Sequence, residues 1–217
     1  MIFDSVSAPW WDDRPVFVIG GGPSLAGYDL SGLMNRGWVL GINKVPALVP
    51  CHAGFTLDQL FLKNSRDLVQ DQADFGVEYY AGVGADHPDP RIQGVRYVER
   101  IQGVGLSKNP AAVVNGLNSG YGALNLAVLK RAREIYLLGY DMHKPGHDRP
   151  PHWHGGYPWY TGSSEIYFGR WAARFDEAKR DLPAGVRVVN ANPRSAVRCF
   201  AFTSYEELGL CQVHGLS

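Results

Sequence analysis

A glycine-rich turn near the start of the chain is suited to holding a phosphorylated ligand. The apolar segment Val16-Phe17-Val18-Ile19 runs directly into Gly20-Gly21-Gly22-Pro23-Ser24, and α/β proteins use such strand-to-turn junctions to present main-chain N–H groups to phosphate. A dinucleotide fingerprint would need a glycine at Leu25 and an acid at Asn43, and a P-loop would need Gly-Lys-Ser/Thr. The turn therefore predicts a nucleotide-type ligand of another class. A tight turn without a ligand is the alternative.

A second unusual segment, residues 142–163, is rich in histidine and aromatic residues. Its length is typical of loops that cover active sites, and its aromatic content argues against disorder. Imidazole titrates near neutral pH and a tyrosine can stabilise a departing phosphate. We therefore predict a lid with catalytic candidates His143, His152, His154, Tyr157 and Tyr160. The spacing, which includes His147, matches no common structural zinc site, and no metal site is predicted. Exposed histidines around a packed aromatic plug are the alternative.

Polar residues follow several other predicted strands. They are Asn43, Asp58, the pair Gly139 and Asp141, and the helix start Asn118-Ser119-Gly120. Parallel strands bring their carboxyl ends to one edge, so these residues are expected to line one crevice with the glycine turn. The N–H groups at 118–120 form a second natural anion site. Asn43 and Asp58 could instead serve only to cap turns.

The elements that position these residues alternate along the chain. Strands are predicted at 15–19, 38–42, 53–57, 77–80, 95–98, 134–138 and 186–189, and helices at 29–35, 57–70, 119–132 and 165–182. This alternation predicts one α/β, Rossmann-like three-layer domain over residues 1–217, with a mostly parallel sheet and helices on both faces.

Composition sets limits on partners and location. Lys plus Arg (21) balance Asp plus Glu (21), which gives no support to nucleic acid as a partner. Lys130, Arg131 and Arg133 suit a helix C-terminus, whereas Arg194 and Arg198 are expected to meet a phosphate. Three cysteines and a start without a signal peptide predict a reduced, cytoplasmic protein, and no segment approaches the roughly 20 apolar residues of a membrane span. A homo-oligomer stays an open alternative to a monomer, because these residues do not indicate the oligomeric state.

Several of these motifs, in order, resemble a family. Gly22-Pro23-Ser24-Leu25, followed by Asp29, Ser31 and Leu33, is similar to the start of the bacterial sialyltransferases that use CMP-sialic acid. Asn43 resembles their nucleotide-contacting asparagine, Asn118-Ser119-Gly120 their Thr-Ser-Gly, and the segment EIYLLGYD at 134–141 their Glu-Ile-Tyr-Leu-Ser-Gly-Ile-Asp. The chain departs from that family at Gly21, at His143 and near residues 160–163, where the family has asparagine, tyrosine and a catalytic histidine.

The same motifs occur in phage-encoded proteins and in proteins similar to archaeal 6-hydroxymethylpterin pyrophosphokinase. The resemblance implies transfer of a sugar from a nucleotide-activated, CMP-type donor to a hydroxyl of a glycan, a small molecule or a modified DNA base. A lid histidine, His152 or His154, would be the base. The alternatives are a pyrophosphokinase that acts on a pterin-like alcohol and needs Mg²⁺ at Asp58 and Asp141, and a non-catalytic phage nucleotide-binding protein. A phage protein would act in the host cytoplasm.

Overall fold

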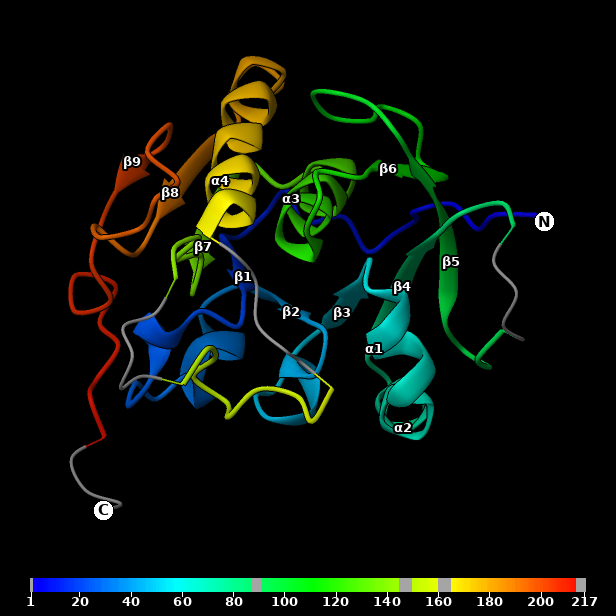
Figure 1. Ribbon diagram of the computed structural model, residues 1–217, viewed down its shortest axis with the longest axis horizontal. Coiled ribbons are helices and arrows are strands. Elements are labelled where there is room, and N and C mark those ends of the chain that lie inside the picture. Colours follow the sequence, from blue (N-terminus) through cyan, green and yellow to red (C-terminus); the bar gives the residue numbers. More distant parts are fainter. Residues whose placement is uncertain (1, 87–90, 145–149, 160–164, 214–217) are drawn as a thin grey trace.

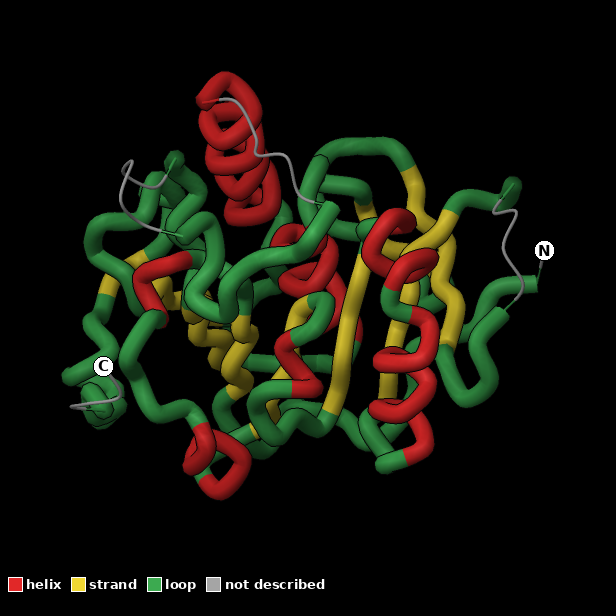
Figure 2. The backbone as a smooth tube through the Cα atoms, turned by 60° about the horizontal axis from the view of Figure 1, so that its bottom comes forward, coloured by secondary structure: helices red, strands yellow, loops and turns green. Residues whose placement is uncertain are grey.

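All nine strands of the described chain pair in parallel within one sheet. The computed structural model describes residues 2–86, 91–144, 150–159 and 165–213 (Figure 1). The strand order is β6-β5-β4-β3-β2-β1-β7-β8-β9, and the strands run side by side in Figure 2. The bounds are β1 Val16–Ile19, β2 Trp38–Ile42, β3 Ala53–Thr56, β4 Glu78–Val83, β5 Arg96–Ile101, β6 Ala112–Val114, β7 Glu134–Leu138, β8 Arg187–Asn190 and β9 Ala201–Phe202. The predicted α/β class is confirmed.

Both faces of the sheet are covered. Alternate side chains of β1 enter different clusters: Val16 and Val18 pack with α3 (Ser119–Leu129) and α4 (Glu165–Arg180), whereas Phe17 and Ile19 pack on the other side. That second face carries the 3-10 turns Pro23–Leu25, Ser31–Asn35 and Val45–Ala47, and farther along α1 (Gln59–Asn64) and α2 (Arg66–Asp74). In Figure 1, α3 and α4 lie above the central strands β1, β2 and β3, and α1 and α2 lie below β4.

Helix α3 is buried almost all round, and polar residues fix it in place. The Asn125 side chain accepts hydrogen bonds from the N–H groups of Ser107 and Val114 and donates to the Ser107 carbonyl. At the other end, the fully buried Lys130 lies 2.5 Å from Glu78 on β4 and also donates to the Ser7 carbonyl. Lys130 therefore has the structural role expected of it.

Several boundaries differ from the sequence predictions. The helix predicted at 57–70 is two helices that meet at Ser65, and the segment at 29–35 is a 3-10 turn in which Asp29 accepts from the Ser31 N–H. Helices α3 and α4 end three and two residues earlier than predicted. Strands β4 and β5 continue past their predicted ends, and the short edge strands β6 and β9 were not predicted because two or three residues carry too little alternation.

Gly82 lies in the part of β4 beyond its predicted end. A Cβ at this position would lie 2.3 Å from the Leu57 side chain, so a glycine here makes room for that residue. Among the helices that the structure describes, none is both long and apolar enough to cross a bilayer. The three cysteines are free thiols, as expected.

Candidate functional site

A cavity of about 390 Å³ opens at the carboxyl ends of the central strands. After β1 the chain builds the sheet outward to β6 and then returns to β7 on the other side of β1, so the strand order reverses beside this cavity. Ligands of open parallel sheets bind at such a reversal. The wall includes the predicted residues Gly20, Gly21, Gly22, Pro23, Asn43, Asp58, Asn118, Ser119, Gly120, Gly139, Asp141, His143 and His152.

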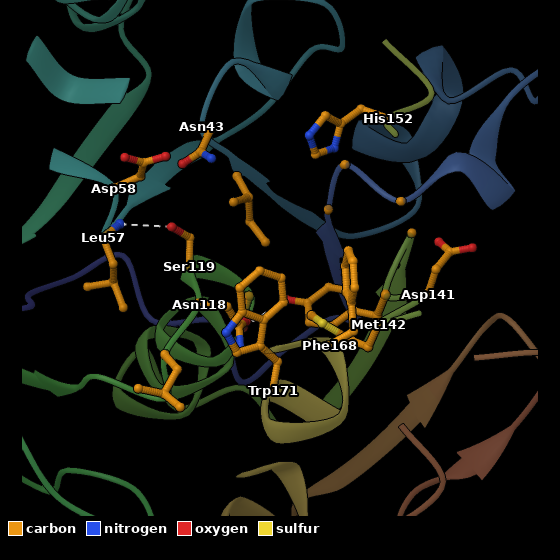
Figure 3. A pocket seen from close by; sticks show the side chains of 18 of the residues that line it. Asn43, Leu57, Asp58, Asn118, Ser119, Asp141, Met142, His152, Phe168 and Trp171 are labelled. Atoms are coloured by element: carbon orange, nitrogen blue, oxygen red, sulfur yellow. Dashed lines mark hydrogen bonds between the residues drawn. The ribbon is translucent and has the colours of Figure 1, made fainter. Parts of the chain in front are cut away.

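The start of α3 forms one corner of this cavity. Asn118 caps the helix by accepting the Tyr121 N–H at 2.9 Å, and the hydroxyl of Ser119 accepts the Leu57 N–H at 3.0 Å (Figure 3). The main-chain N–H groups of Ser119 and Gly120 have no acceptor among the described residues. Because Ser119 uses its oxygen toward Leu57, its hydroxyl proton remains available to a ligand.

Arg100 on β5 adds a positive charge to the same corner. Its guanidinium donates to the Leu57 carbonyl at 3.3 Å, which places it on the residue that Ser119 also contacts. Its Nε atom is buried and has no acceptor among the described residues. Two helix N–H groups, a hydroxyl and an arginine thus line one part of the cavity, and such a set of donors suits an anion. We refer to Arg100, Ser119 and Gly120 as the anion corner.

The N–H groups of the glycine turn are used differently from the sequence prediction. Gly20 and Gly22 donate to the carbonyls of Leu138 and Gly139 at 2.8 and 2.9 Å, and the Ser24 N–H donates to Asp141 at 3.2 Å. A three-residue 3-10 turn follows, not an α-helix. The turn therefore joins β1 to β7 instead of presenting a row of donors to a phosphate.

Asp141 is the centre of that junction. Its carboxylate accepts from the Ser24 N–H and hydroxyl, the latter at 2.8 Å, and from the Asn192 amide at 3.2 Å. The Tyr205 hydroxyl lies 2.7 Å from the Ser24 hydroxyl and accepts the Gly139 N–H. Burial raises the pKa of Asp141, and the bonds from Ser24 oppose this rise. Ser24 itself lies outside the cavity wall.

Residues 150–159, called the strap here, are held across the glycine turn. The main-chain N–H of Trp153 donates to the Gly21 carbonyl at 3.1 Å, and its indole donates to the Gly20 carbonyl at 2.9 Å. Lys44, just after β2, donates to the carbonyls of His154 and Gly156 at 3.0 and 2.8 Å. These four bonds anchor the described part of the predicted lid.

The strap histidines differ in position. His152 lines the cavity, and a Cβ at Gly21 would lie 2.9 Å from its Nδ1. Burial lowers the pKa of His152, although a hydrogen bond with the Gly21 backbone raises it in part. His154 stacks on His152 at 5.0 Å but does not line the cavity, and burial together with Lys44 lowers the pKa of His154 to about 3.

The predicted tyrosines and arginines are placed as follows. Tyr157 packs on both histidines outside the cavity wall, and burial raises the pKa of Tyr157 to about 12. Tyr160 and His147 lie outside the described residues. Arg194 and Arg198, expected at a phosphate, are not among the cavity residues, and Arg198 instead donates to the Pro193 carbonyl.

Three apolar side chains, which the sequence did not single out, line the wall of the cavity that faces His152. Phe168 and Trp171 come from the first turns of α4, with ring centroids 5.1 Å apart, and Met142 follows β7 (Figure 3). Their spacing of three residues places both aromatic rings on one face of α4. That spacing was the available signal, but it equally predicts a core-facing helix.

Backbone strain concentrates at the cavity. Among the described residues, four that are not glycine have a positive φ between 50° and 68°, and three of these line the cavity, namely Asn43, Leu117 and Met142. Such conformations cost free energy and are enriched at functional sites. The backbone conformation therefore supports the cavity as the functional site, and this evidence does not depend on the shape of the cavity.

The carboxylates do not fit a shared magnesium ion. Asp58 and Asp141 lie on opposite sides of the cavity in Figure 3. Asp58 caps α1 by accepting the Phe61 N–H at 3.0 Å, and both oxygens of Asp141 are bound by protein donors. In the part of the chain that the structure describes, no three His, Cys, Asp or Glu side chains group as metal ligands would.

Comparison with family models, with curated proteins and with solved structures finds no match.

Proposed function

We propose that the protein is a transferase that binds a nucleotide-activated sugar at this cavity and transfers the sugar to an acceptor hydroxyl. The anion corner holds the donor phosphate, because the N–H groups of Ser119 and Gly120, the Ser119 hydroxyl proton and the Arg100 Nε have no acceptor among the described residues and belong to one cavity wall. Asn43 and Asp58, on the neighbouring wall, supply oxygen acceptors for sugar hydroxyls. The observation that carries the proposal is that Arg100 and the start of α3 both contact Leu57 and line the same cavity, with donors that have no acceptor among the described residues.

The chemistry is a direct displacement. The acceptor oxygen forms a bond to the anomeric carbon while the bond from that carbon to the phosphate oxygen breaks, and the phosphate leaves with the electron pair. The leaving charge develops at the anion corner, where fixed donors stabilise it. The acceptor proton passes to His152, which lines the cavity and is kept neutral by its lowered pKa.

The separated carboxylates favour this reaction over pyrophosphate transfer. A pyrophosphokinase bridges ATP phosphates with Mg²⁺, and the ion needs converging oxygen ligands. Asp58 and Asp141 are each bound by protein donors on different walls. Sugar transfer by displacement needs a phosphate site and a base, and the described residues can supply both.

A ligand panel tests the proposal. We expect CMP, CDP, UDP, GDP or ATP to raise the melting temperature of the protein at millimolar concentration, with the same midpoint shift with or without Mg²⁺. Arg100→Gln should abolish most of that shift, whereas Arg198→Gln, an exposed arginine away from the cavity, should retain it. Failure of every nucleotide to shift the wild-type protein, or equal loss in both variants, would refute the phosphate site.

A further inference from the structure

We infer that Trp171 is the platform on which the planar base of the donor stacks. The inference rests on the proposed function. It adds the position of the donor's base in the cavity and the chemical class to which that base belongs. Trp171 lines the cavity from α4, half-buried, and in Figure 3 its indole reaches from that helix toward the start of α3.

The indole of Trp171 has a different environment from the other aromatic rings of the core. Phe175, one turn later on α4, is fully buried and packs edge-on against Tyr121 and Tyr140. Trp171 has one ring neighbour among the described residues, Phe168, at an interplanar angle of 76°. An edge-on neighbour orients the indole and leaves a ring face for a second planar group.

The polar edge of this indole is also open. The indole N–H of Trp38 donates to Asp13 and that of Trp153 to the Gly20 carbonyl. The indole N–H of Trp171 has no acceptor in the described part of the chain, so it can donate a hydrogen bond to a ligand. Core packing therefore does not account for this side chain, whereas a stacked base with a polar edge does.

The anion corner and the wall that contains Trp171 together determine how the donor lies in the cavity. The phosphate occupies the anion corner at the start of α3, and the base lies over Trp171 with Phe168 and Met142 around it. The ribose spans between them, which leaves the side near His152 for the transferred sugar. Nucleobases offer a planar ring for this wall, and a sugar phosphate without a base does not.

Paired ligands separate stacking from phosphate binding. Isothermal titration with CMP, UMP, GMP, AMP and ribose 5-phosphate is compared for the wild type and three variants. Trp171→Leu should weaken the affinity for each nucleotide about 10- to 100-fold, because loss of base stacking on an aromatic ring lowers affinity by about that factor. The affinity for ribose 5-phosphate should be unchanged. Trp171→Phe should restore most of the affinity. Trp10→Leu, which changes a tryptophan over Arg131 outside the cavity wall, should bind as the wild type does.

The outcomes distinguish the two proposals. If the wild type binds nucleotides and Trp171→Leu binds them equally well, or loses ribose 5-phosphate to the same extent, the stacking role is wrong and the phosphate site stands. If the wild type binds ribose 5-phosphate as tightly as every nucleotide, the base is not recognised and the role is also wrong. If it binds none of the five ligands, the proposed function fails and the stacking role with it.

Discussion

The carboxylate of Asp141 occupies the space into which a side chain at Gly22 would extend. A Cβ at Gly22 would lie 1.8 Å from Oδ2 of Asp141 and 2.4 Å from the Gly139 carbonyl oxygen. The φ of Gly22 is −60°, which any residue can adopt. Contact between β1 and β7, and not backbone conformation, therefore requires glycine here.

We expect Gly22→Ala to lower the free energy of unfolding by about 3 kcal/mol or more, since overpacking that must move backbone is costly. Chemical denaturation measures this change. Gly169→Ala is the matched control: nothing lies within 4 Å of its added Cβ on α4, and it should stabilise the protein by about 0.5–1 kcal/mol. If Gly22→Ala were as stable as the wild type, Asp141 and Gly139 would be able to move aside at little cost in free energy, which would contradict this prediction.

The second prediction concerns the pH dependence of transfer. His152 acts as a base in its neutral form, and burial lowers its pKa. Activity should therefore persist as the pH falls below 6.5 and be lost only as the pH passes through the lowered value. Initial rates of sugar transfer from pH 4 to 8, with the donor found in the ligand panel, measure this limb.

His152→Ala should reduce the transfer rate about 10²- to 10⁴-fold across this range. The same change at His154, which does not line the cavity, should affect the rate far less. An acidic limb with its midpoint above 6.5, or equal losses in the two variants, would contradict the assignment of the base.

The third prediction concerns acid stability. The pKa of His154 is about 3 in the folded protein, against an ordinary value of 6.5. Between these values the unfolded chain binds a proton that the folded chain does not, so stability falls as the pH is lowered through that interval. The slope for this one group is at most about 1.4 kcal/mol per pH unit, and less because His154 is only partly enclosed.

Urea unfolding at pH 7, 6, 5 and 4 checks the acid-stability slope. His154→Phe, which keeps a planar ring on His152, should flatten the dependence, whereas His143→Gln, at an exposed position, should keep the wild-type slope. His52 and His152 also have lowered pKa values, so some dependence remains in every variant. An unchanged slope in His154→Phe would exclude His154 as a contributor.

The fourth prediction concerns the buried ion pair. Lys130→Met keeps the apolar stem but removes the charge that Glu78 and the Ser7 carbonyl contact. Glu78 retains Arg96 at 3.2 Å, so the expected loss of stability is about 2–3 kcal/mol, near the lower end for a broken buried pair. Arg187→Met, which breaks an exposed pair with Glu134, should cost less than about 1 kcal/mol. Thermal unfolding of both variants compares them, and equal losses would contradict the argument.

Sequence patterns predicted the sheet and the edge where the cavity lies, because strand-end residues such as Asn43, Asp58 and Asp141 meet wherever parallel strands end together. They did not predict how the glycine turn uses its N–H groups, since the partners of Gly20 and Gly22 are 117–118 residues away, at the end of β7 and just after it. Arg100 was missed because it lies two residues beyond the strand predicted at 95–98, in the part of β5 that the sequence pattern did not reveal. Trp171 was missed because helical spacing does not distinguish a ring over the core from a ring over a cavity.

The three side chains around Asp141 come from widely separated parts of the chain, with Ser24 after the first strand and Asn192 and Tyr205 beyond the eighth. During synthesis, a polypeptide that has left the ribosome only as far as β7 contains the anion corner and the glycine turn but lacks Asp141, Asn192 and Tyr205, which organise the junction between β1 and β7. The cavity lining is therefore complete only when the segments that follow β7 have been added, since Asp141, Phe168 and Trp171 belong to it.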